Sequence, residues 1–140
     1  MPEAESVLKA IQLNTMKKQQ IFLPLILGVF GLVVWIVVSQ VSHQKEAWDS
    51  GYYFQIGLPL MFAASAVAGY LKPGRPWRWG LFVFALQPIA LFLQSQEGPL
   101  VVVGLFFFLL FAAVAVGCAY IGSIIRHTAE RARRDAAESR

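Results

Sequence analysis

Residues 98–125, GPLVVVGLFFFLLFAAVAVGCAYIGSII, form the longest stretch of the chain that lacks an Asp, Glu, Lys, Arg or His side chain. A helix needs roughly 20 apolar residues to cross a hydrocarbon core of about 30 Å, so this stretch predicts a membrane-spanning helix. Three further charge-free stretches occupy residues 19–44, 50–71 and 79–96. With 57% apolar residues in 140, the chain predicts an all-α membrane protein, a four-transmembrane-helix bundle with short loops.

The four spans are expected at residues 21–40, 52–71, 79–94 and 100–125. They leave a cytoplasmic arm, 1–20, and a cytoplasmic tail, 126–140, and no room for a soluble domain, so residues 1–140 form a single integral membrane domain. Pro24 is expected in the first turn of the first span, where its missing N–H costs nothing. Tyr52 and Tyr53 are expected at the outer interface, where amphipathic aromatic side chains collect.

The basic residues are sorted by side of this predicted membrane. Eleven of the twelve Lys and Arg residues lie in the arm, the second loop or the tail, and Lys45 alone lies in another loop. Because Lys and Arg near span ends stay in the cytoplasm, both termini are predicted to be cytoplasmic. The small size, the short loops and this sorting are typical of a bacterial inner (plasma) membrane protein. The net charge of +4 then reflects orientation, and no nucleic-acid partner is expected.

The second loop concentrates charge and aromatic side chains at the inner interface. It reads Lys72-Pro73-Gly74-Arg75-Pro76-Trp77-Arg78, in which Pro and Gly reverse the chain. Lipid headgroup contact is expected from four of these residues: Lys72, Arg75, Trp77 and Arg78.

The arm has helical spacing before the first span. Ala4, Val7, Leu8, Ile11 and Thr15 recur at intervals of three and four, which is typical of one face of a helix. Three alternatives stay open: a helix lying in the interface, a solvated arm, or a face that docks on a partner.

Small residues form a possible packing or partner face on the second and fourth spans. They recur at heptad-like spacing, as helices packed closely in lipid require. The face comprises Gly57, Ala64 and Ala68 on the second span and Ala112, Ala115, Ala119 and Gly122 on the fourth. Either the face packs inside the bundle, or it meets another copy or another membrane protein.

Gln87-Pro88 is a polar pair in the middle of the third span. An amide in lipid needs hydrogen-bond partners, and Pro88 can kink the helix. Gln87 is expected either to bond Gln55 or Ser65 across the bundle, or to line a small polar cavity.

The predicted spans contain no ionisable side chain other than Cys118 and tyrosines, and His43 and His127 lie at opposite faces. Ion-coupled carriers usually need such a group within the membrane. We therefore expect no catalytic residue, no cofactor and no metal site. The expected function is that of a non-catalytic accessory, assembly or inhibitory subunit, possibly of the immunity type, whose partners are membrane lipids and another membrane protein. The alternative is a homo-oligomeric channel or facilitator for a neutral or hydrophobic solute.

Topology reporters test the charge rule. Fusions at residue 47 and after residue 140 should report opposite sides of the membrane, because one loop and the tail are separated by an odd number of crossings. Matching signals would contradict the four-crossing topology.

Overall fold

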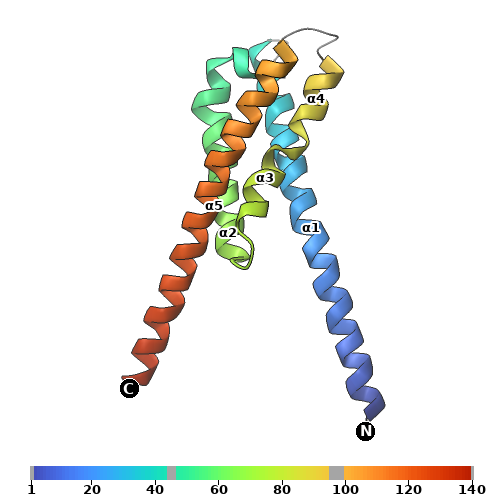
Figure 1. Cartoon of the computed structure of the whole chain (residues 1–140), viewed down its shortest axis with the longest axis vertical. Helices are drawn as coiled ribbons and strands as arrows, with labels where there is room; N and C mark the ends of the chain where they lie inside the picture. Colours follow the sequence, from blue (N-terminus) through green and yellow to red (C-terminus); the bar gives the residue numbers. More distant parts are fainter. Residues whose placement is uncertain (1, 44–46, 95–99, 140) are drawn as a thin grey trace.

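The computed structural model describes residues 2–43, 47–94 and 100–139, which are 92% helical and contain no strand (Figure 1). The elements in chain order are α1 (Pro2–Ser42), a 3-10 turn (Ala47–Asp49), a π-helix (Tyr53–Gly57), α2 (Leu58–Leu71), α3 (Trp77–Ala85), α4 (Gln87–Gln94) and α5 (Leu100–Glu138). The all-α prediction is therefore confirmed for the described residues. Residues 1, 44–46, 95–99 and 140 lie outside them.

Within the described residues, three helices are long and apolar enough to cross a membrane: Ile21–Ser42, Tyr53–Leu71 and Val101–Glu138. The third predicted span corresponds to a shorter apolar segment, Trp77–Leu93, which is broken between α3 and α4. The large apolar side chains exposed around the bundle are those that a lipid environment accommodates.

The arm belongs to the same helix as the first span. α1 runs without interruption from Pro2, because residues 2–20 are rich in Ala, Leu, Lys, Gln and Glu, which favour helix. The expectation that Pro24 lies in a first turn is wrong: it lies well inside α1 and is buried. Of the predicted arm face, the side chains of Ala4 and Thr15 lie outside the described part of the structure.

α3 is the central helix and contacts α1, α2 and α5. These contacts are close because glycine removes a side chain wherever two backbones meet. A Cβ at Gly31 would overlap the carbonyl of Val83, and one at Gly80 would overlap the backbone of Val116. The most extensive helix contact in the bundle is that between α2 and α5. There a Cβ at Gly69 would overlap the Ala119 carbonyl, and one at Gly122 would overlap the Ala66 carbonyl.

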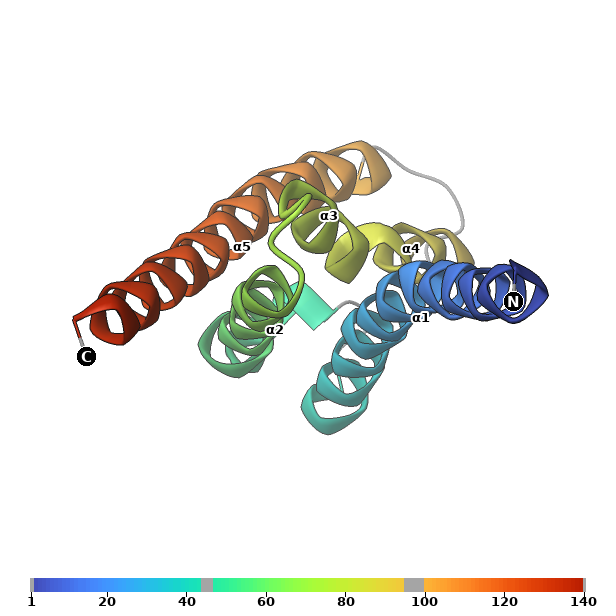
Figure 2. The same ribbon diagram turned by 90° about the horizontal axis from the view of Figure 1, so that it is seen from below.

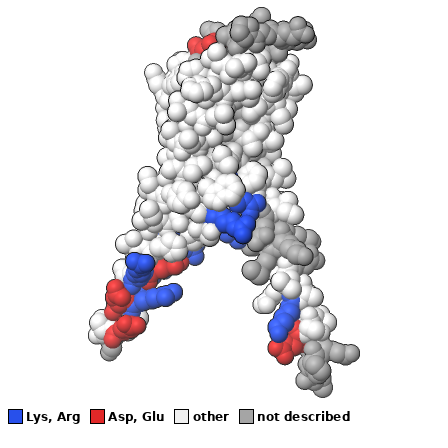
Figure 3. Space-filling model, in the orientation of Figure 1, with Lys and Arg blue, Asp and Glu red and all other residues white. Residues whose placement is uncertain are grey.

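The described ends of the chain lie at one end of the molecule, where α1 and α5 diverge (Figures 1 and 2). Figure 3 shows a broad body without charge, with Lys and Arg at its lower edge, both basic and acidic side chains on the two arms, and an acidic patch at the opposite end. The loop between α2 and α3 lies at the basic end. The molecule is thus a helical body with an uncharged middle and two helical arms on its basic side.

Two glycines of α5 offer a matched test of this packing. Gly122→Ala would place a Cβ against the Ala66 carbonyl, and overpacking of this kind costs about 1–3 kcal/mol. Gly117→Ala meets no atom within 4 Å and should leave stability unchanged or raise it slightly. Thermal unfolding in mild detergent should show a lower Tm for Gly122→Ala alone; equal Tm values would contradict the packing.

Candidate functional site

The helix break between α3 and α4 places a polar side chain in the middle of the bundle. α3 ends at Ala85, Leu86 forms a turn and α4 begins at Gln87. Pro88 has no N–H to donate, and the next N–H, that of Ile89, bonds the Leu86 carbonyl at 3.2 Å in a tighter turn. The predicted kink at Pro88 thus coincides with an observed break.

Gln87 is fully buried, and both ends of its amide are bonded. Its Oε1 accepts a hydrogen bond from the Tyr53 hydroxyl at 3.1 Å. Its Nε2 donates to the Gly31 carbonyl at 3.2 Å and lies 2.8 Å from the Met61 sulfur. One side chain therefore joins α4 to α1, the π-helix and α2. We call these four residues the amide centre: Gln87, Tyr53, Gly31 and Met61.

The expected partners of Gln87 are wrong. Gln55 is exposed, and the Ser65 hydroxyl bonds the Met61 carbonyl at 2.9 Å on its own helix. Because Gln87 is enclosed and bonded, the structure favours the hydrogen-bonded interpretation of this residue over the polar cavity.

Tyr53 is the residue that sequence reasoning missed. It was expected at the interface beside Tyr52, yet it is fully buried while Tyr52 is 54% exposed. Tyr53 is the first residue of the π-helix, which ends at Gly57, directly before α2. Pro59 lies in the first turn of α2, and its missing N–H favours an irregular helical turn at this point. The sequence did contain a signal for its burial. Tyr53 lies four residues before Gly57, so the two share a helix face, and Gly57 belongs to the predicted small-residue face.

Aromatic rings surround the amide centre on the side of α1 and α5. Trp35 contacts Tyr53 edge-on, with ring centroids 5.5 Å apart, and contacts Phe108 at the same separation. Phe111 lies 6.4 Å from Tyr53. This shell keeps lipid and water away from the bonded amide. The amide centre contains no group that is charged at neutral pH, and its hydrogen bonds hold the helices together.

The small-residue face lies mainly inside the bundle. Ala115 and Ala119 are fully buried, and Gly57, Ala68, Ala112 and Gly122 are buried as well, whereas Ala64 is half-buried. Where α2 meets α5, Ala119 lies against Gly69 and Gly122 against Ala66, whereas Gly57 of the predicted face lies against Val34 and Val38 of α1.

The basic turn between α2 and α3 is held by hydrogen bonds to its carbonyl groups. Trp79 Nε1 donates to the Lys72 carbonyl at 2.9 Å, and Ser123 Oγ donates to the Pro73 carbonyl at 3.3 Å. Arg126 of α5 donates to the carbonyls of Tyr70 and Leu71 at 3.1 and 2.9 Å, which caps the end of α2. The turn therefore has a fixed backbone that positions its cationic side chains.

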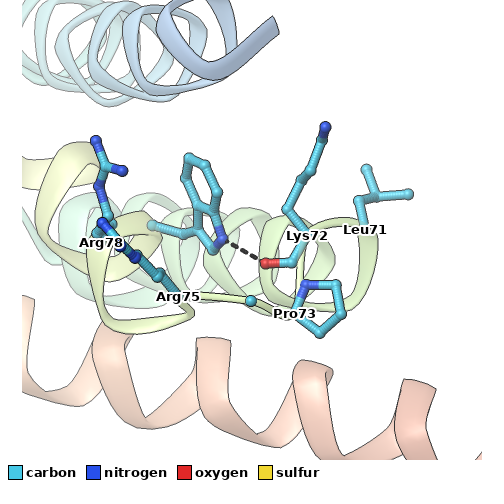
Figure 4. Close-up of a pocket in the computed structure, with 7 residues that line it drawn as sticks. Leu71, Lys72, Pro73, Arg75 and Arg78 are labelled. Carbon is cyan, nitrogen blue, oxygen red and sulfur yellow. Dashed lines mark hydrogen bonds between the residues drawn. The ribbon is translucent and has the colours of Figure 1, made fainter. Parts of the chain in front are cut away.

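A pocket of about 430 Å³ lies at this turn. Three of the four residues predicted to contact headgroups line it: Lys72, Arg75 and Arg78. In Figure 4, Lys72 and Arg78 extend to the same side of the turn, and Arg75 lies close to Arg78. The fourth, Trp77, is 47% exposed and lies outside the pocket lining. The arrangement suits an anion or an anionic headgroup.

No family model, curated protein or solved structure matches this chain. Among the residues that the structure describes, no cluster of three His, Cys, Asp or Glu side chains is placed to hold a metal ion.

A double-mutant cycle tests the amide centre. Tyr53→Phe and Gln87→Leu each break the same hydrogen bond, so their effects on unfolding free energy should be non-additive. The coupling should be about 0.6 kcal/mol, and at most about 1.7, as for side-chain hydrogen bonds in other membrane proteins. Tyr52→Phe, which removes an exposed hydroxyl, is the matched control and should show no coupling to Gln87→Leu.

Proposed function

We propose that this chain crosses a bacterial inner membrane four times with both termini in the cytoplasm. α3 and α4 together run from the basic turn to the opposite end of the bundle (Figure 1), which supports counting them as one crossing despite their break. The collection of Lys and Arg at the end with both termini (Figure 3) supports the orientation.

We further propose that the protein is a non-catalytic accessory, assembly or inhibitory subunit, possibly of the immunity type, that binds another membrane protein. The observation that carries this proposal is the pair of projecting arms. Residues 2–20 of α1 extend over about 28 Å, and residues 126–138 of α5 over about 20 Å, at 1.5 Å per residue. Figure 3 shows an open space between the two arms below the body.

The α1 arm presents an apolar stripe made of Val7, Leu8 and Ile11. These side chains are 56%, 62% and 58% exposed, and they share one face of the helix. Apolar residues at such spacing are how helices dock into grooves of other proteins. On the same arm Glu5 and Lys9 form an exposed ion pair, and Leu13 is exposed on the opposite face.

The interior of the bundle supports the same proposal. The amide centre is bonded at Gln87, and the small-residue seam between α2 and α5 is filled by its own chain. Over residues 2–43, 47–94 and 100–139, the surfaces that remain for recognition are the arms, the basic turn and the outward helix faces.

The arm stripe can be tested with two leucines of equal exposure. Leu8 lies in the stripe, and Leu13, 59% exposed, lies on the opposite face of α1. If a partner covers the stripe, Leu8→Gln should weaken co-purification in mild detergent roughly tenfold or more, because a buried Leu contributes about 1.5–3 kcal/mol. Leu13→Gln should leave it unchanged.

Mass analysis of the purified complex decides between the two function classes. A foreign membrane protein in fixed ratio, lost only in Leu8→Gln, supports the accessory subunit. A homo-oligomer without a foreign chain, which passes a neutral solute when placed in vesicles, would replace the proposal with the channel or facilitator.

A further inference from the structure

Two hollows meet at Arg78. The first is the basic pocket at the turn, and the second is an apolar groove of about 380 Å³ between α1 and α3. Arg78 lines both of them, and every other residue of the groove is apolar: Ile21, Pro24, Leu25, Gly28, Phe82, Ala85 and Leu86.

The groove exists because small or short residues face each other on the two helices. α1 contributes Pro24 and Gly28, and α3 contributes Ala85. The two sides approach closely at Gly28, since a Cβ added there would lie 3.2 Å from the Leu86 side chain and 3.4 Å from the Phe82 carbonyl of α3. The hollow is therefore a groove on the surface of the bundle and does not pass through it.

Arg78 is placed between these two environments. Its guanidinium lies over the Phe82 ring, 5.7 Å from the centroid, which directs it along the groove wall. Within the described ranges neither Arg78 nor Arg75 forms an ion pair with an acidic side chain. Two guanidinium groups and the Lys72 ammonium thus face one pocket, and its lining residues include no acid.

We propose that this composite site holds one anionic phospholipid of the inner leaflet, with its phosphate between Arg75 and Arg78 and an acyl chain in the α1–α3 groove. The phosphate supplies the negative charge that the lining lacks, and guanidinium groups bind phosphate through paired N–H donors. The acyl chain needs only apolar walls, which the groove provides up to Arg78. The site lies at the edge of the uncharged body, where headgroups would be (Figure 3).

Specificity should come from the headgroup. Lipid tails already solvate apolar side chains, so the groove adds fit but little free energy. A zwitterionic lipid with identical chains should therefore bind less tightly, because its own ammonium group competes with the arginines. The choice of the inner leaflet rests on the proposed orientation, whereas the lipid site itself is independent of the proposed accessory function.

Native mass spectrometry of the full chain in mild detergent tests the proposal. With phosphatidylglycerol added, we expect a one-to-one adduct that is retained about fivefold more strongly than phosphatidylcholine of the same chains, the scale of one basic residue at an anionic surface. Arg78→Gln should abolish the preference and Arg78→Lys should keep most of it. Arg131→Gln, which removes the same charge from the exposed tail, should have no effect.

Two further experiments distinguish a bound phospholipid from the alternatives. Ala85→Trp fills the groove and should reduce retention of the lipid with the arginines intact. Inorganic phosphate at the lipid concentration should not compete; competition would show a free-anion site instead. If Arg78→Gln lowers the Tm so far that it unfolds, Arg75→Gln gives the same reading, because the Arg75 side chain is exposed. Equal retention of both lipids, or equal loss in Arg131→Gln, would overturn the proposal.

Discussion

Gln87 brings a primary amide into the middle of an apolar bundle at the one point where the third helical segment is broken. An amide in hydrocarbon has no water to bond, so the protein must supply both a donor and an acceptor. Tyr53 supplies the hydroxyl and Gly31 the carbonyl. The other features of the interior follow from these bonds: Gly31 must lack a side chain so that α3 and the amide can approach, and Tyr53 must turn inward, which the π-helix allows.

The helical elements could be predicted from the sequence because charge and length alone decide which segments enter a membrane. Which side of each helix faces inward could not be predicted as well. Lipid-facing and core-facing side chains are both apolar, so a buried Tyr53 and an exposed Tyr52 look alike in the sequence. The small residues were the better guide, since close backbone approach restricts size. The partners of Gln87 were missed because a π-helix and a broken helix shift register in ways that 3.6-residue spacing does not describe.

The basic turn shows how a topological signal and a shaped site can share residues. Charge sorting explains why Lys72, Arg75 and Arg78 lie on one side, but it requires no fixed geometry. The structure adds that geometry through Trp79, Ser123 and Arg126, which bond successive carbonyls from Tyr70 to Pro73. In the proposed topology, the residues that set the orientation would also form a surface of fixed geometry. The prediction from sequence named the three cationic residues of the pocket as headgroup contacts. Trp77, which it named with them, is exposed outside the lining, and Trp79 lines the pocket.

The position of the amide centre along the chain also affects the order of synthesis. Gly31, Tyr53 and Met61 all precede Gln87, so each group that bonds its amide is made before the amide itself. In the proposed four-crossing topology, a nascent chain whose α1 and α2 have entered the bilayer would already present these hydrogen-bonding groups to the broken third segment. That segment would then meet the partners of its amide as it enters. α5 emerges last and closes the bundle over it.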